Sequence, residues 1–396
     1  TLNAKAAQSL EAARKTAEAR GATARERKHV DALAAWCAGD MRKATDLWED
    51  ILIDAPRDML ALKLGHYSHF YFGVSRELRN SVARVLPAWD ADAPDYGFLM
   101  AMRAFGLEET GAYAEAEEAG RAAVALNPAD IWGVHAVAHV MEMQGRFREG
   151  IEWIAGLEAD WDPANNFRYH VWWHRALYHL ELEDHATVLS LYDDRIRVDR
   201  TEEVLDHSNG ASMLWRLEAE GVDVGDRWEE LADIAVRHAE DQILAFADLH
   251  YVMALAGAGR LGGADQMAAA MAGVTDEGRL TEAPVLRTVA APLAQGLIAF
   301  RRGDHDRALS LMLPIRYAVG AVGGSHAQRD VFARTLIDAA LGAGQPALAR
   351  ALVAERLGQN PNSPWSWKRM ARAREALGET AAAGQAEGKA EALLAA

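Results

Sequence analysis

The sequence predicts an all-α superhelix, a solenoid of stacked two-helix hairpins that can close around a central cavity. Apolar residues recur at helical spacing along the 396 residues, and the alternating β-branched runs that indicate strands are absent from the sequence. Glycines recur at a fixed interval, since 34 residues separate Gly111 from Gly145 and Gly344 from Gly378. A proline follows three of the recurring glycines after 17 residues and a fourth after 18.

These glycines and prolines predict where helices end and begin. The pairs are Gly39 with Pro56, Gly111 with Pro128, Gly145 with Pro163, and Gly344 with Pro361. Glycine closes a helix in the left-handed conformation at low cost. Proline suits the first turn of the next helix, where its missing N–H would have no partner. Each pair therefore brackets the second helix of a hairpin.

Two segments show the repeat most clearly. They read GAYAEAEEAGRAAVALNPAD (111–130) and GQPALARALVAERLGQNPNS (344–363). Small residues at helix contacts, followed by an asparagine–proline corner, resemble the second half of a tetratricopeptide repeat. The sequence therefore predicts a tetratricopeptide-like array.

No linker or low-complexity run divides the sequence, which predicts a single helical-repeat domain over 1–396. We expect an N-terminal helix over 1–30 and regular repeats over 31–192. The intervals between weaker repeat units then become irregular, which predicts a degenerate, loop-rich insertion over 193–232. Further repeats and a C-terminal cap are expected over 233–396.

The composition is that of a folded protein with an acidic surface. Hydrophobic residues make up 50%, charged residues 25%, and the formal net charge is −16. This charge repels phosphates and anionic lipids, so neither nucleic-acid nor membrane binding is expected. The one cysteine, Cys37, is expected to be buried and inert, and a cytoplasmic location is expected. No dinucleotide or phosphate-binding motif occurs, so no cofactor is expected. A homodimer is compatible with exposed end helices.

Six strings extend the similarity beyond the generic repeat. They are KLGHYSHFYFG (63–73), AFGLEETGAYAEAEEAGRAA (104–123), DIWGVHAVAHVMEMQGR (130–146), SMLWRLEAEGVDVGDRWEELAD (212–233), FADLHYVMA (246–254) and GGSHAQRDVF (323–332). Together they resemble the tetratricopeptide repeat protein 38 family, over most of the chain. The resemblance implies a cytosolic helical-repeat fold and implies little about activity.

Two neighbouring repeats place histidines at matching heights of their inner helices. The pairs are His135 with His139 and His170 with His174, each 7 and 11 residues after the corner proline of its repeat. Spacing of four residues puts each pair on one helix face. In the tetratricopeptide pattern these positions point into the concave groove. Glu142 follows His139 by three residues on the same face, so four imidazoles and a carboxylate are expected to converge there.

Other side chains are candidates for ligand binding around the same groove. They are His66, His69, Trp132, Trp173, Asp248, His250, His326, Gln328, Arg329 and Asp330. Ser325 and Gln328 fit a capping box that would begin a helix. His326 and Arg329, at the positive end of that helix, would suit an anionic ligand. The remaining histidines that we assign structural roles are His179, His185, His207, His238 and His305.

Three interpretations of the aligned histidines remain open. They can be structural, packed against neighbouring tryptophans and Tyr169. They can bind a metal, since His-x-x-x-His on a helix is a zinc-binding geometry, although the full His-Glu-x-x-His motif is not present. They can also line a metal-free pocket for a small polar or anionic molecule. The candidate residues for acid/base catalysis there are His135, His139, Glu142, His170 and His174.

Two classes of function compete at this point. Tetratricopeptide arrays commonly hold peptides along the concave face through asparagines and lysines. Histidines and bulky aromatic residues replace these groups here, which favours a small-molecule pocket, with or without turnover. A peptide-binding scaffold and a zinc- or other metal-dependent hydrolase are the alternatives.

Overall fold

The computed structural model describes residues 2–278 and 281–396, and these residues form helices and no β-strand. The helices of the first half are α1 (Leu2–Arg20), α2 (Ala24–Cys37), α3 (Met41–Asp54), α4 (Met59–Tyr71), α5 (Ser75–Val85), α6 (Tyr96–Glu108), α7 (Tyr113–Leu126), α8 (Ile131–Gln144), α9 (Phe147–Gly156), α10 (Glu158–Trp161), α11 (Phe167–Glu181) and α12 (His185–Leu191). Those of the second half are α13 (Val204–Ala219), α14 (Arg227–Arg237), α15 (Ala245–Gly257), α16 (Leu261–Gly273), α17 (Ala283–Val285), α18 (Ala291–Arg301), α19 (His305–Met312), α20 (His326–Gly342), α21 (Pro346–Gln359), α22 (Pro364–Ala376) and α23 (Thr380–Ala395). Short 3-10 and π turns cover Leu86–Ala88, Tyr192–Ile196, Leu286–Ala290, Leu313–Ile315 and Val319–Val322.

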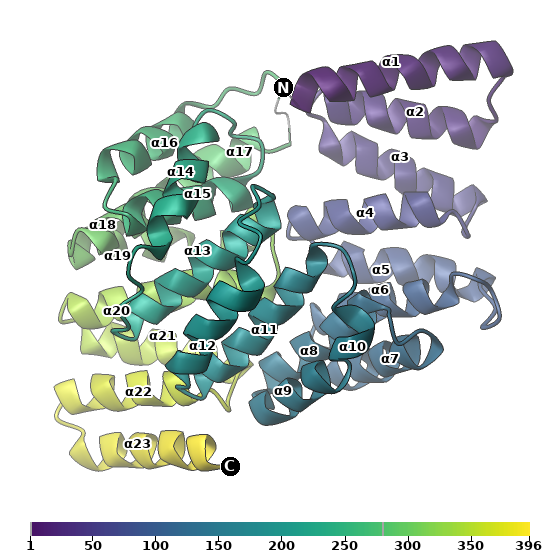
Figure 1. Ribbon diagram of the computed structural model, residues 1–396. Helices are drawn as coiled ribbons and strands as arrows, with labels where there is room; N and C mark the ends of the chain where they lie inside the picture. Colours follow the sequence, from purple (N-terminus) through teal and green to yellow (C-terminus); the bar gives the residue numbers. More distant parts are fainter. Residues whose placement is uncertain (1, 279–280) are drawn as a thin grey trace.

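Successive helices pair into hairpins, and the hairpins stack one on the next (Figure 1). The first helices of consecutive hairpins also contact one another, from α6 through α8, α11, α13, α15 and α18 to α20, and they form the inner layer. This arrangement is a tetratricopeptide-like helical solenoid, and it confirms the all-α fold class.

The recurring glycines end helices as predicted, whereas the corner prolines do not begin them. Gly111 and Gly145 have φ angles of 82° and 69°, in the left-handed region. Pro128 lies in a turn, and α8 begins three residues later. Asp130 caps α8, because its Oδ1 accepts a hydrogen bond from Trp132 N at 3.1 Å. An aspartate that satisfies a free N–H, rather than a proline that lacks one, starts the helix.

The predicted N-terminal helix over 1–30 is divided into two helices. The chain turns at Gly21, whose φ is 72°. Thr23 and Glu26 then form a capping box that begins α2, with Glu26 N donating to Thr23 Oγ1 at 3.2 Å and Thr23 N donating to the Glu26 carboxylate at 2.8 Å. The capping box therefore begins a new helix, although the residues of this segment favour one continuous helix.

The predicted loop-rich insertion over 193–232 contains most of a helical hairpin, α13 and α14. Nearly all of α13 is buried, including Leu214 and Trp215, and Trp228 and Leu231 bury one face of α14. A turn at Gly221, whose φ is 80°, joins the two helices, and no proline follows this glycine at the regular distance. The interval was irregular because the connections on either side are longer than in the regular repeats.

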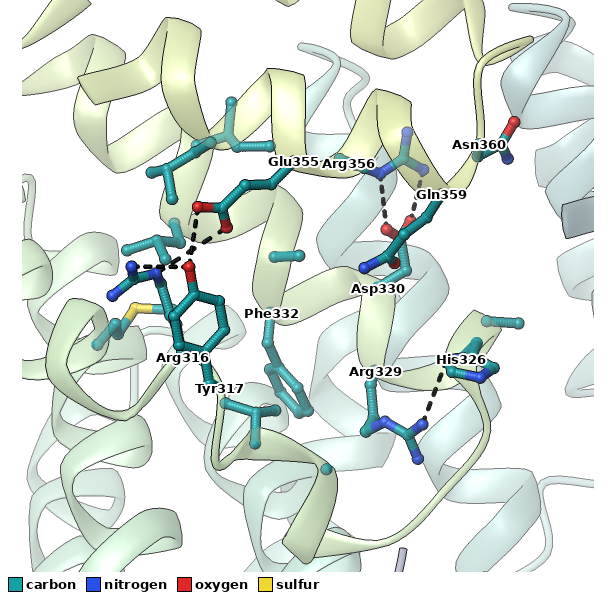
Figure 2. A pocket seen from close by; sticks show the side chains of 18 of the residues that line it. Arg316, Tyr317, His326, Arg329, Asp330, Phe332, Glu355, Arg356, Gln359 and Asn360 are labelled. Atoms are coloured by element: carbon teal, nitrogen blue, oxygen red, sulfur yellow. Dashed lines mark hydrogen bonds and ion pairs between the residues drawn. The ribbon is translucent and has the colours of Figure 1, made fainter. Parts of the chain in front are cut away.

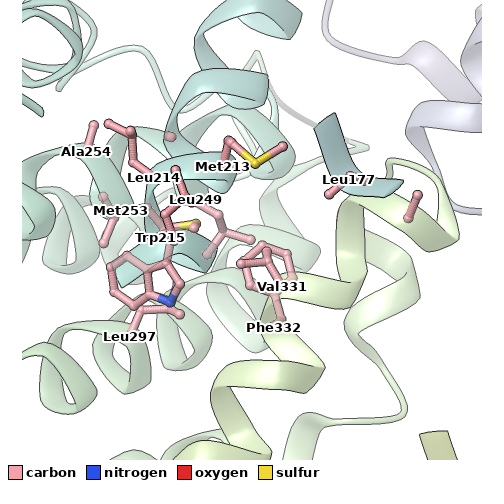
Figure 3. Packing of buried hydrophobic residues seen from close by; sticks show 14 of the residues in the cluster. Leu177, Met213, Leu214, Trp215, Leu249, Met253, Ala254, Leu297, Val331 and Phe332 are labelled. Carbon is pink, nitrogen blue, oxygen red and sulfur yellow. The ribbon is translucent and has the colours of Figure 1, made fainter. Parts of the chain in front are cut away.

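The largest hydrophobic core extends from α7 to α23 and includes the inner layer of the second half (Figure 3). Leu249, Leu297 and Phe332 come from α15, α18 and α20, and they point toward one another in Figure 3. Trp215 packs among them and donates its indole N–H to Thr335 Oγ1 at 3.0 Å. Helix α20 is therefore held inside the superhelix by apolar packing.

The superhelix winds tightly enough for its last repeats to contact the first half. Asn360 donates its side-chain amide to the Glu142 carbonyl oxygen at 3.1 Å, and Asn362 donates to that of Gln144 at 2.9 Å. The end of α11 also meets the last repeats, because Glu181 binds Arg334 of α20 and Ser363 at the start of α22, and these last helices are drawn in yellow-green and yellow in Figure 1. The two asparagine contacts join residues about 218 positions apart along the sequence.

The segment before α20 crosses the end of α4 at very short range. A Cβ on Gly73 would lie 1.8 Å from the Gly320 carbonyl oxygen, and one on Gly323 would lie 2.4 Å from that of Tyr71. Both glycines also have positive φ angles, of 64° and 85°. Only glycine fits at such a crossing. Because the backbones meet here, α20 covers the concave face that an open array would expose.

One helical run, Ala283–Arg301, is long and apolar enough to cross a membrane by length and composition. Within the protein 61% of its most apolar window is buried, and α18 packs against α15, α16 and α19. A buried core helix passes the same test, so this run is weak evidence for a membrane span.

Cys37 differs from its prediction, since it is exposed: it is the last residue of α2, beside the half-exposed Trp36.

Candidate functional site

Helices α8 and α11 bring the two histidine pairs into one group, which we call the histidine cluster (His135, His139, His170 and His174). The ring centroids of His135 and His139 are 4.4 Å apart, and those of His139 and His174 are 4.3 Å apart. His170 lies 5.0 Å from His135 on the same measure. One ring nitrogen from each of the four histidines lies within 4.8 Å of the other three. The convergence predicted from the repeat register is therefore present in the fold.

The cluster, predicted to lie on the concave groove of the array, is buried. His139 and His174 have no exposed surface. Phe105 packs edge-on to His139, Phe167 packs against His135, and Trp173 stacks on His170 at 5.2 Å. The rings are covered because α20 occupies the concave face and because these aromatic side chains fill the remaining space.

Most of the nitrogens in the cluster have no hydrogen-bond partner in the described part of the chain. They are both ring nitrogens of His135, both of His139 and Nε2 of His174. Burial lowers the pKa of His135, His139 and His174 well below the usual value, and it lowers that of His170 to about 4. The imidazoles are therefore neutral at pH 7, with lone pairs available.

Polar side chains from α6, α8 and α13 orient the rings. His170 Nδ1 donates to Asn209 Oδ1 of α13 at 2.9 Å. His174 Nδ1 is 2.8 Å from Glu142 Oε2 of α8, and His139 Nδ1 is 3.6 Å from Glu108 Oε2 of α6. Burial raises the pKa of Glu142 to about 8, and burial near Glu109 raises that of Glu108 well above the usual value.

A cavity of about 160 Å³, which we call the aromatic cavity, adjoins the cluster. Its walls are largely the rings of Tyr67, Phe70, Tyr71, Phe105, Trp132 and Phe167. His135, His139 and His170 face it, as does His66. Lys63 also lines it, with Nζ 3.6 Å from the centre of the Trp132 ring. Burial lowers the pKa of this lysine to about 8.

A second cavity of about 270 Å³, which we call the α20–α21 cavity, lies on the other side of the first turn of α20 (Figure 2). Arg356 binds Asp330 through two hydrogen bonds of 2.7 and 2.9 Å. Tyr317, 76% exposed, donates its hydroxyl to Glu355 at 3.0 Å. The charges that line this cavity are therefore largely neutralised by one another.

A carboxylate of the protein, that of Glu109, lies at the first turn of α20. Ser325 and Gln328 form the predicted capping box, with Ser325 N donating to Gln328 Oε1 at 2.9 Å. The backbone N–H of His326 donates to Glu109 Oε1 at 3.0 Å, and Arg329 lies 3.6 Å from the same carboxylate. The expected anionic ligand at this helix end is thus replaced by Glu109 of the protein itself.

The structure distributes the predicted ligand-binding residues over several places. His66, Trp132 and Gln328 line the aromatic cavity, whereas Glu142, His326, Arg329 and Asp330 line the α20–α21 cavity. The others, which line neither of these two cavities, are His69, Trp173, Asp248 and His250. His69 is paired with Glu49 at 3.1 Å, and His250 Nδ1 donates to the Phe246 carbonyl at 2.7 Å.

Sequence reasoning missed Lys63, Glu108 and Asn209. Lys63 precedes His66 on α4 and projects toward the next repeats. Glu108 ends α6, one residue before Glu109, and both acids are buried. Asn209 lies in the segment that was expected to be loop-rich. Only the observed repeat pairing brings these three residues to the cluster.

Comparison with known proteins returns distant likenesses to solved structures. No protein-family model matches the chain. A tetratricopeptide repeat protein from Parabacteroides merdae is similar at 14% identity and a TM-score of 0.31, covering 75% of this chain and 93% of that one. The human IFIT1 dimer with PPP-AAAA is similar at 15% identity and 0.38, covering 100% and 87%. A monomeric IFIT1 mutant with Gppp-AAAA gives 16% and 0.41, covering 99% and 87%. Likenesses this distant carry no argument about function.

Proposed function

We propose that the protein binds a small anionic molecule with a flat, apolar body in the aromatic cavity. The observation that carries this proposal is a half-buried lysine among six aromatic rings beside four histidines. Aromatic walls with a few convergent polar groups are typical of small-molecule sites. The volume of about 160 Å³ is close to that of an engineered cavity of about 150 Å³ that holds benzene.

Lys63 supports the anionic character of the ligand. Burial disfavours the charged form of Lys63 and lowers its pKa, whereas the nearby Asp130 raises it. A ligand carboxylate within contact distance would restore the lysine's ordinary preference for a proton. The ring of Trp132, stacked on Phe167 with centroids 3.8 Å apart, would pack against the apolar body of the same ligand.

Metal-free acid/base chemistry by the histidines receives less support than binding. Imidazoles with strongly lowered pKa values are weak bases, and at pH 7 they lack the acidic imidazolium proton that a general acid would donate. A peptide in the concave groove also receives little support at the histidines, because α20 fills that face. Binding of a small molecule is thus the function that we propose.

We further propose membership of the tetratricopeptide repeat protein 38 family. The two most specific strings of that resemblance, HAVAHVMEMQGR (135–146) and GGSHAQRD (323–330), lie on α8 and at the start of α20. These two helices contact each other beside the histidine cluster. Two of the six strings of the resemblance therefore lie beside the histidine cluster.

Benzoate, with benzamide as its neutral counterpart, tests the proposed function by isothermal titration calorimetry. We expect benzoate to bind more tightly than benzamide, and Lys63→Met to weaken benzoate binding about tenfold or more, since a charged hydrogen bond is lost. Lys43→Met, at an exposed lysine of α3, is the control and is expected to leave binding unchanged. Equal binding of benzoate to the Lys63 variant and the parent would contradict the proposal.

A further inference from the structure

We infer that the histidine cluster binds a divalent transition-metal ion, with zinc as the expected occupant. The inference deepens the proposed function, because the ion would lie at the inner end of the aromatic cavity. Imidazole nitrogen is a preferred ligand of zinc and of its first-row neighbours. Two His-x-x-x-His pairs on adjacent helices supply four such ligands.

The geometry of the cluster is close to that of a four-coordinate site. Zinc–nitrogen bonds of about 2.0–2.1 Å in a tetrahedron separate the ligand nitrogens by about 3.3–3.4 Å. The four candidate nitrogens already lie within 4.8 Å of one another. Rotation of the imidazole rings covers the remaining distance, and the backbone of α8 and α11 can stay in place.

The unsatisfied nitrogens are the observation that points to a ligand. His135 and His139 are buried, and the described chain offers no hydrogen-bond partner to any of their four ring nitrogens. Nε2 of His174 is in the same state. Leaving a buried polar atom unpaired is costly, and native proteins satisfy nearly all of them. One metal ion would satisfy a nitrogen on each ring.

The neighbouring hydrogen bonds prepare the rings for coordination. Asn209 and Glu142 lie at Nδ1 of His170 and of His174, which leaves Nε2 of each ring free to bind a metal. Metal-bound histidines usually donate their second N–H to a carboxylate or an amide oxygen in this way. Glu108, 3.6 Å from His139 Nδ1, is placed for the same role.

The charges around the cluster also suit a dication. Glu108 and Glu109 are buried carboxyl groups that offer ligand atoms within 4.8 Å of a His139 ring nitrogen, and Glu142 lies 2.8 Å from His174 Nδ1. Both oxygens of Glu108 have no hydrogen-bond partner in the described residues. His135, His139 and His170 line the aromatic cavity, so an anionic ligand in that cavity could reach the ion.

Cobalt(II) and zinc binding to the full chain, produced without a histidine tag and stripped with a chelator, test the inference. We expect one ion per chain, with the visible absorption of tetrahedral cobalt that one equivalent of zinc abolishes. His139→Gln is expected to weaken cobalt binding at least about 100-fold, by analogy with the loss of one ligand from a four-ligand site. His179→Gln, at a half-buried histidine farther along α11, is the matched control and should bind as the parent does.

Folding and ligand binding are checked separately from metal binding. Circular dichroism shows whether His139→Gln folds, and His139→Cys, which supplies a thiolate ligand, should restore cobalt binding with a thiolate charge-transfer band. Cobalt that binds the parent and the folded His139→Gln protein equally would overturn the inference. Benzoate titration in the presence of chelator tests the aromatic cavity alone, so failure of the metal site and failure of the proposed function give different results.

Discussion

Asp206, in the first turn of α13, is a buried carboxyl group whose pKa is raised to about 6, chiefly by burial. Thr201 donates its hydroxyl to Asp206 Oδ2 at 2.5 Å, and nearby Glu203 opposes ionisation further. The folded pKa is above the unfolded value of 3.8, so the folded state binds more protons between these values. The stability contributed by the protonated form is therefore lost as the pH rises from about 4 to about 6.

Asp206→Asn removes this pH dependence while keeping an oxygen for the Thr201 hydroxyl. We expect the variant to be more stable than the parent by about 2 kcal/mol at pH 7, and by much less at pH 4.5. Urea unfolding at several pH values measures the difference. If the stability curves of parent and variant run parallel between pH 4.5 and 7, Asp206 does not titrate in that range.

The residues of the candidate site differ in how far the sequence alone could reveal them. The two histidine pairs occupy equal positions in regular repeats, so counting from the corner prolines was enough to predict their convergence. Glu108 precedes Gly111 by three residues, as Glu142 precedes Gly145, so the same counting could have found it, whereas Asn209 of α13 has no such register. Burial could not be predicted for any of them, because it depends on α20, which follows some 150 residues later in the chain.

At the scale of helices, α4 illustrates how one side chain starts an element. Asp58 Oδ1 accepts a hydrogen bond from Ala61 N at 3.0 Å, and its other oxygen lies 3.0 Å from His29 Nε2. Burial tends to raise the pKa of this carboxyl, but the bonds from Ala61 and His29 hold it below the usual value. The cap thus joins α4 to α2 of the preceding repeat.

Asp58→Ala removes both the cap and the link to His29. We expect a loss of about 1–2 kcal/mol, the usual cost of removing an N-cap. Hydrogen exchange at the amides of α4 and denaturant unfolding both report it. Asp58→Asn retains the capping oxygen and should recover most of the loss; an equal loss in both variants would show that the charge, and not the cap, is the important property.

Helices were predictable from sequence where glycine and proline recurred together, and their boundaries were missed elsewhere. Gly111 and Gly145 ended helices as expected because the left-handed turn requires glycine. The hairpin of α13 and α14 has a glycine turn but no corner proline. Its irregular spacing therefore predicted a loop-rich segment, although its apolar residues recur at helical spacing. Local turn chemistry therefore predicts helices reliably only in the regular repeats.

At the scale of the whole molecule, closure of the superhelix depends on a buried ionic network. Glu181, at the end of α11, binds Arg334 of α20 and accepts a hydrogen bond from Ser363 Oγ at 2.9 Å. Arg356 lies 3.7 Å from the same carboxylate. Asp330 pairs with both arginines. No repeat pattern predicts this network, because its members come from repeats that are distant in sequence.

Glu181→Gln tests whether the two halves stabilise each other. In an open solenoid each repeat interacts with its neighbours only, and one distant contact contributes little. Here the substitution leaves two buried arginines with Asp330 as their main remaining partner, so we expect a loss of about 3 kcal/mol in urea unfolding. Glu183→Gln is the control: its carboxylate pairs with Lys368 at 2.5 Å on the surface, and such pairs contribute about 0–1 kcal/mol. Equal, small effects of both substitutions would show that the repeats unfold independently and that closure adds no stability. A large effect confined to Glu181 would mean that the fold burying the histidine cluster depends on contact between its first and last repeats.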